Sequence, residues 1–215
     1  MMLAMAYPVS VTVEPQLTNR NRQTTALRLF LAIPHLLLVG GVGASFAVHQ
    51  GRADNVTSAG GETGLLGSIA FVLAIASWFT ILILDEHFTA IRRYSTFYLR
   101  WRVRALAYLM LLQDAYPPFG DAAYPAALVF EERAGPRNRA SVMIRILAAL
   151  PHFFVLFGIA CVWWATTVVA WIAILVNGKY PAALYDFGVG ALRYLVRVEA
   201  YMLLLTDEYP PFSLT

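Results

Sequence analysis

Charged residues and cysteines are scarce in this chain of 215 residues. Only 13% of the residues are charged and 59% are hydrophobic, with a mean hydropathy of +0.61, whereas about a quarter of the residues of soluble domains are charged. The single cysteine, Cys161, rules out an internal disulfide and any cysteine-based zinc or iron–sulfur site. The composition therefore predicts an integral membrane protein.

Catalytic and targeting motifs are missing as well. The chain has no HExxH, no P-loop, no GxGxxG followed by a suitable acid and no paired-cysteine motif. We therefore expect no enzyme, no catalytic residue and no metal site. Residues 1–10 lack the basic start and long apolar core of a signal peptide. The net charge of +3 does not indicate a nucleic-acid partner, because the basic residues follow the membrane topology described below.

What the sequence does contain is a tandem repeat. Residues 99–119 and 192–212 are identical at 13 of 21 positions, spaced as on one helix face, and both end in Tyr-Pro-Pro-Phe. Upstream matches have an offset of 117 residues and later ones an offset of 93, so the first copy carries 24 extra residues, around 49–64. We divide the chain into repeats 1–119 and 120–215.

Each repeat is expected to open with a short strand. Residues 9–14 alternate between β-branched and polar side chains, and residues 126–131 are their equivalents. The two copies could pair with each other.

The apolar runs that follow predict a transmembrane helical hairpin in each repeat. In the first repeat they are 25–48 and 65–84, each close to or above the ~20 residues that cross a bilayer. In the second, 142–176 would measure about 52 Å as one helix, too long for a hydrocarbon core of ~30 Å. We therefore expect this run to turn near 158–164, beside a pair of tryptophans suited to a membrane interface.

The basic residues predict the orientation of these four spans. Fifteen of the 16 Lys and Arg residues would lie on one side, which places both termini in the cytoplasm. Two hairpins of equal orientation imply a pseudo-two-fold axis along the membrane normal.

The last segment of each repeat, 87–113 and 180–206, is apolar but interrupted by arginines. A central arginine costs roughly 2.5–3.5 kcal/mol on insertion into a bilayer. We therefore expect amphipathic helices that lie at the cytoplasmic interface or re-enter the bilayer, each ended by the two prolines of Tyr-Pro-Pro-Phe. The predicted fold class is an all-α integral membrane protein built from a duplicated unit of strand, transmembrane hairpin and amphipathic helix.

Several phrases resemble one known family. RLFLAIPH, the opening YPVSVTVE, and YPAALYDFGVGALRYLVRVEAYMLLLTDEYPPF are similar to the bacterial membrane-protein family called domain of unknown function 4389. The resemblance covers nearly the whole chain, although residues 85–88 of the first half depart from residues 178–181 of the second. It implies a multi-pass protein of the bacterial plasma (inner) membrane and implies no activity.

His35 and His152 are the first candidate functional residues. Each follows a proline in the first apolar run of its repeat. Facing each other across a helix bundle, they could hold a haem or another pigment, or they could relay protons. Alternatively, each imidazole only hydrogen-bonds an arginine segment or a backbone carbonyl freed by the proline.

A second set of candidates lies on the repeated helix face. It could bind anionic lipid head groups, or its arginines could pair with Asp114, Asp207, Glu14 or Glu131. The two tyrosines are expected to anchor the interface. The set comprises Arg100, Arg104, Arg193, Arg197, Asp114, Asp207, Tyr108 and Tyr201.

These features favour a non-enzymatic accessory or scaffold subunit that binds lipid and docks on other membrane proteins or on itself. A small transporter or channel is the second hypothesis, because duplication is common in transporters. A haem or pigment protein ligated by the two histidines is the third.

Overall fold

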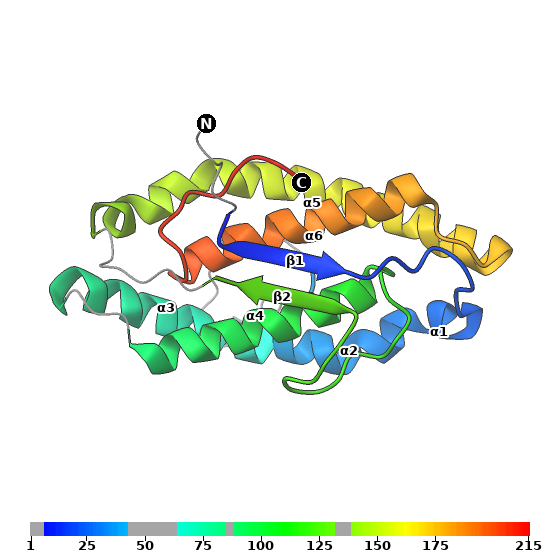
Figure 1. Cartoon of the computed structure of the whole chain (residues 1–215), viewed down its shortest axis with the longest axis horizontal. Helices are drawn as coiled ribbons and strands as arrows, with labels where there is room; N and C mark the ends of the chain where they lie inside the picture. The colour runs from blue at the N-terminus through cyan, green and yellow to red at the C-terminus, as the bar shows by residue number, and fades with distance from the viewer. Residues whose placement is uncertain (1–6, 43–63, 85–87, 132–138) are drawn as a thin grey trace, which may run out of the picture.

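The fold was analysed in a computed structural model, which describes residues 7–42, 64–84, 88–131 and 139–215. In the described residues the protein is mostly helical and carries one two-stranded sheet (Figure 1). The elements, in chain order, are β1 (Val9–Val13), α1 (Arg22–Ala26), α2 (Arg28–Val39), α3 (Gly64–Leu84), α4 (Thr89–Leu109), β2 (Ala126–Phe130), α5 (Arg139–Asn177) and α6 (Ala182–Met202).

Strands β1 and β2 pair with each other, an arrangement that their repetition made possible. The pairing is antiparallel, and Val11 lies opposite Leu128, its own equivalent at an offset of 117 residues. A two-fold axis normal to the sheet, between Val11 and Leu128, therefore relates the two strands. The alternate residues Val9, Val11, Ala126 and Leu128 are buried, whereas Ser10 and Thr12 are exposed.

Helix α5 runs without a break for 39 residues, about 58 Å at 1.5 Å per residue. The turn predicted near residues 158–164 is therefore wrong, and with it the hairpin of the second repeat and the plan of four upright spans. The turn was predicted because an apolar helix was expected to fit the thickness of a bilayer. Pro151 lies inside the helix without ending it.

The first repeat contains the same long helix in two pieces. The residues after Val39 and before Leu65 correspond to one position of α5, Phe157, when the two offsets are applied. A Cβ atom on Gly64 would lie 2.5 Å from the nitrogen of Gly40, and Gly64 has a φ of +66°, so this position requires glycine. Helices α2 and α3 therefore meet end to end where the insertion leaves and returns.

Arg102 of α4 satisfies the backbone groups that this break frees. Its guanidinium donates to the carbonyl oxygens of Val39 and Gly41, the second at 3.0 Å, and to both carboxylate oxygens of Glu199, at 2.7 and 2.9 Å. Carbonyls at the end of a helix need such partners. The insertion predicted around residues 49–64 thus departs near Gly40; residues 43–63 lie outside the described part of the chain.

Most of the described helical residues belong to four rods, formed by α2 with α3 and by α4, α5 and α6, which lie beside the sheet (Figure 1). The long rods are α2 with α3, and α5, which run in opposite directions; α4 and α6 pack between them and against each other. Strand β2 packs on α4 and β1 packs on α6. The segments predicted as amphipathic helices, 87–113 and 180–206, are thus α4 and α6, and they carry most of the buried core.

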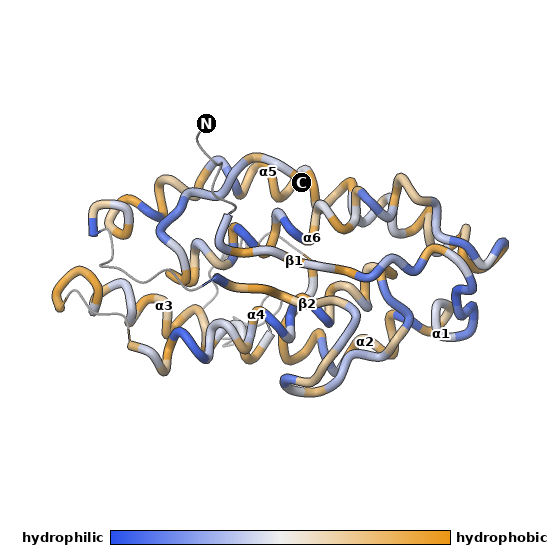
Figure 2. Tube along the Cα trace, viewed as in Figure 1, coloured by the Kyte–Doolittle hydropathy of each residue, from blue (hydrophilic) through white to orange (hydrophobic). Residues whose placement is uncertain are grey.

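The long rods expose apolar side chains. On α5, large exposed hydrophobic residues extend from Met143 to Val176, and α2 and α3 carry others such as Phe30 and Phe79. By length and composition alone, α3 and α5 could each cross a membrane, and α2 is a shorter apolar helix. Figure 2 shows hydrophilic residues gathered at the ends of the rods, in connecting segments and at short stretches of α4 and α6.

Helices α4 and α6 end before the prolines, which corrects the predicted stop. Leu111 and Leu204 adopt left-handed conformations, with φ of 63° and 60°. The next amide groups bond back into the helix, from Leu112 to the carbonyl of Ala107 at 2.8 Å and from Leu205 to that of Ala200 at 3.0 Å. This closing pattern usually uses glycine. The Tyr-Pro-Pro-Phe segments therefore follow a turn that is already complete.

The broken rod leads to a first prediction. Deleting residues 41–64 and replacing Gly40 by Ala joins α2 to α3 in the phase of α5, and we expect a folded protein with one continuous helix. Arg102 then loses its carbonyl acceptors, so the deletion alone is expected to lower the free energy of unfolding. Adding Arg102→Leu and Glu199→Leu, which copies the leucines at the equivalent positions, should recover about 1–4 kcal/mol.

Thermal unfolding followed by circular dichroism in detergent measures this effect. Loss of helix content in the deletion protein with both leucines would contradict the end-to-end arrangement.

Candidate functional site

In the first repeat, a buried ion pair ties the start of α2 to the end of α4. Arg28 places Nη2 at 2.6 Å from Oδ1 of Asp114 and donates from Nη1 to the carbonyl of Gln113 at 2.8 Å. Its guanidinium carbon lies 4.0 Å from the centre of the Tyr108 ring, a cation–π distance. The Arg28 side chain is 2% exposed.

The second repeat builds the same unit from equivalent residues. Arg145 places Nη2 at 2.8 Å from Oδ1 of Asp207, and its Nη1 donates to the carbonyl of Thr206 at 3.0 Å. Its guanidinium carbon lies 4.4 Å from the centre of the Tyr201 ring. In both repeats an arginine of the long rod therefore binds an aspartate. That aspartate follows the helix that packs along the rod, which is α4 in the first repeat and α6 in the second.

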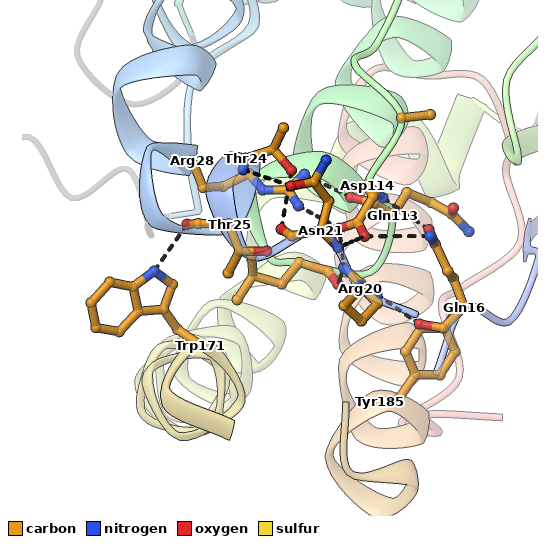
Figure 3. A network of polar contacts seen from close by, with 12 residues as sticks. Gln16, Arg20, Asn21, Thr24, Thr25, Arg28, Gln113, Asp114, Trp171 and Tyr185 are labelled. Atoms are coloured by element: carbon orange, nitrogen blue, oxygen red, sulfur yellow. Dashed lines mark hydrogen bonds and ion pairs between the residues drawn. The ribbon is translucent and has the colours of Figure 1, made fainter. Parts of the chain in front are cut away.

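Asp114 collects further donors in the first repeat (Figure 3). Arg20 Nη2 lies 2.8 Å from Oδ1, while the backbone N–H of Asn21 and Gln16 Nε2 donate to Oδ2 at 2.9 and 3.3 Å. Burial lowers the pKa of the Arg20 guanidinium, and the carboxylate of Asp114 counteracts that shift. Several charge-assisted bonds thus offset the cost of burying this group.

Hydrogen bonds in the same region also join the repeats. Trp171 of α5 donates to the carbonyl of Thr25 at 3.0 Å (Figure 3). The Tyr185 hydroxyl of α6 donates to the carbonyl of Glu14 at 3.0 Å.

The arginines predicted as partners of these aspartates lie elsewhere. Arg104 donates to the carbonyl of Ala122 at 2.6 Å and contacts Asp121 at 3.2 Å. Arg197 donates to the carbonyls of Ser213 and Thr215, at 3.2 and 2.6 Å. Burial lowers the pKa of Arg104, which Asp121 opposes. Both arginines hold the chain that follows a Tyr-Pro-Pro-Phe segment.

Arg100 and Arg193 also differ from the predicted pairing. Arg100 contacts Asp121 at 3.3 Å, and both side chains are about half exposed. Arg193 donates to the carbonyl of Val11 at 3.0 Å and so attaches β1 to α6. Their partners were predicted from opposite charge, whereas most of these guanidinium groups donate to backbone carbonyls.

The Tyr-Pro-Pro-Phe segments fold back over the two histidines. The ring of His35 stacks on Phe119 with centroids 4.5 Å apart and an angle of 19°. Trp101 donates to His35 Nδ1 at 3.0 Å, and the Tyr116 ring lies 5.0 Å away. The imidazole is 1% exposed. One repeated segment therefore forms the cage around the repeated histidine.

His152 occupies the equivalent cage. It stacks on Phe212 at 4.2 Å and 10°, its Nδ1 lies 2.6 Å from the Tyr194 hydroxyl, and the Tyr209 ring lies 4.7 Å away. The ring contacts of His152 and His35 have no residue in common, so the structure does not bring the two histidines to one site. Within the described residues, no group of three or more His, Cys, Asp or Glu could hold a metal ion.

Sequence reasoning missed the residues that complete these units. Arg28 and Arg145 lie at equivalent positions in the two repeats, as do Tyr116 and Tyr209, and Phe119 and Phe212. Their repetition at fixed offsets was the available signal. This repetition did not reveal that the segments after α4 and α6 pack against α2 and α5.

A match to a family model assigns the chain to a family. A family model described as Domain of unknown function (DUF4389) matches residues 63–120 and 139–213. These two segments are more than half of the chain, so the chain belongs to this family. Each segment includes an apolar helix, the helix that returns along it, and Tyr-Pro-Pro-Phe. Searches of curated proteins and of solved structures found no match.

The ion pair at Asp114 gives a prediction about stability. Asp114→Asn removes the charge that balances Arg28 and Arg20, and we expect a loss of about 3–5 kcal/mol, as for a broken buried pair. Asp121→Asn is the matched control, because its exposed side chain is expected to contribute at most about 1 kcal/mol. Unfolding of the two variants in the same detergent measures the difference. Equal stabilities would contradict a clamp at Asp114.

Proposed function

We propose that this protein lies flat in one leaflet of a bacterial plasma membrane, with its long rods in the plane of the bilayer. In this arrangement the apolar faces of α2, α3 and α5 contact the hydrocarbon, and the sheet faces the cytoplasm. It acts as a non-enzymatic accessory or scaffold subunit that binds anionic lipids.

The positions of equivalent arginines carry this proposal. Arg22 donates to the carbonyl of Val176, at the C-terminal end of α5, whereas its equivalent, Arg139, begins that helix. The two lie at opposite ends of a rod about 58 Å long. In an upright molecule the repeated arginines would stand on both sides of the membrane, against the positive-inside rule. In a flat molecule they share one depth.

The length of the apolar face supports the same orientation. Exposed hydrophobic residues cover α5 from 143 to 176, about 50 Å along its axis. A hydrocarbon core of ~30 Å would leave much of this face in water if the helix stood upright. A helix in the membrane plane keeps it in hydrocarbon throughout.

The sheet gives a third argument. Its two strands pair only with each other in the described residues, so each has an outer edge. Open sheet edges and irregular segments do not face hydrocarbon, because their backbone groups would lack partners. With the rods flat, the sheet and the Tyr-Pro-Pro-Phe segments meet water and head groups instead.

This orientation keeps the two-fold axis along the membrane normal and replaces upright hairpins by rods perpendicular to that axis. Tyr7, the first described residue, and Thr215 then belong to the sheet side. The Tyr7 hydroxyl donates to the carbonyl of Glu208 at 3.3 Å, and Arg197 holds Thr215. Arg100, the one exposed residue among the four candidate arginines, is suited to contact anionic head groups.

The accessory role rests on surfaces rather than on a reactive centre. The long apolar faces and the exposed side of the sheet offer contact areas to lipids, to other membrane proteins or to a second copy. The transporter hypothesis and the haem hypothesis rest on the sequence alone.

Thiol labelling tests the orientation. In a Cys161→Ser background, Ala140→Cys and Lys179→Cys place exposed reporters beside opposite ends of α5. We expect a membrane-impermeant maleimide to label both in inside-out vesicles and neither in intact spheroplasts, because both ends lie at the cytoplasmic surface. Thr12→Cys, on the exposed side of the sheet, is the control and should follow the same pattern. Labelling of the two ends from opposite sides would overturn the proposal.

Purification from native membranes tests the accessory role. We expect mild detergent extraction to retain a membrane-protein partner in a fixed ratio, identified by mass spectrometry. Substrate turnover or solute movement by the purified protein alone, in liposomes, would contradict a non-enzymatic scaffold.

A further inference from the structure

An apolar cavity of about 230 Å³ lies between the repeats. Phe71 of α3 and Leu156, Ala160 and Trp163 of α5 contribute to its wall, which also includes residues of α4 and α6, such as Leu195. Of the helices that line it, α3 and α5 also expose apolar faces. A hydrocarbon chain is the occupant that such a lining suits.

One part of this wall is charged. Arg102 and Glu199 both line the cavity and form a pair at 2.7 Å. The equivalent positions in the other repeat are Leu195 and Leu106, so each repeat supplies one charge where the other has leucine. The cavity is therefore asymmetric although it lies between two copies of one unit.

Charge complementarity defines the head group of the ligand. The guanidinium of Arg102 already donates to Glu199, Val39 and Gly41, so the pair presents no net charge. A second carboxylate would meet Glu199, and a cation would meet Arg102, each losing water without full compensation. A neutral hydroxyl can donate to an oxygen of Glu199 with little penalty.

We propose that this cavity binds one hydrocarbon chain of a neutral lipid, with a hydroxyl-bearing head group at the Arg102–Glu199 pair. The inference rests on the membrane location of the proposed function, and it does not depend on the orientation of the rods.

Retention of 1-monooleoylglycerol by the full-length protein tests the site. The protein in detergent is mixed with this probe, separated by gel filtration and measured by native mass spectrometry. We expect one bound molecule per chain. Ala160→Phe fills the cavity and should weaken binding at least about tenfold, the effect of ~1.4 kcal/mol. Ala165→Phe, at an exposed position of the same helix, is the matched control and should bind like the unmodified protein.

A second variant tests the head group without filling the cavity. Glu199→Gln leaves the positive charge of Arg102 unbalanced, so we expect it to bind oleate more tightly than 1-monooleoylglycerol, whereas the unmodified protein prefers the neutral lipid. No binding by the unmodified protein, equal binding by Ala160→Phe and Ala165→Phe, or an unchanged preference in Glu199→Gln would each overturn the proposal. Thiol labelling is independent of these outcomes, so failure of the lipid site and failure of the flat orientation are distinguishable.

Discussion

The antiparallel pairing of two equivalent strands determines the rest of the architecture. Because Val11 lies opposite Leu128, the repeats are related by an axis normal to the sheet. A helix perpendicular to this axis must then run opposite to its equivalent in the other repeat, as Figure 1 shows for α5 and the rod of α2 and α3. The same axis sends the equivalent arginines to opposite ends of the molecule. Basic residues favour the cytoplasmic side of a membrane. The equivalent arginines can all lie on that side only if the two-fold axis is the membrane normal.

Buried charges give the helices specific contacts with one another. The outer faces of the rods are apolar, so burial of apolar surface alone does not determine which faces meet. Arg28 with Asp114, and Arg145 with Asp207, give each long helix one specific contact with the segment that follows its neighbour. The same segment then covers a histidine with its phenylalanine. Removal of one charge leaves the other without a partner, which makes the contact selective as well as stabilising.

Much of the local structure could be predicted from the sequence. The two strands and the helices α4 and α6 were recognised because alternation and helical spacing are local signals, and the repeat revealed that the fold would be built twice. The fate of 142–176 could not be predicted in this way. An apolar run of that length fits a hairpin or a long helix equally well, and only the packing of α6 along α5 distinguishes them. The ion-pair partners were missed for a related reason, since Arg28 and Asp114 are 86 residues apart and meet only when α4 packs along α2.

Polarised infrared spectroscopy of oriented membranes measures most directly how the rods are directed relative to the bilayer. The amide I dichroism reports the mean angle between helix axes and the membrane normal. A flat molecule requires mean helix axes close to the membrane plane, because all four rods are perpendicular to the two-fold axis. Axes tilted by only about 20° from the normal, as is usual for transmembrane helices, would contradict the account.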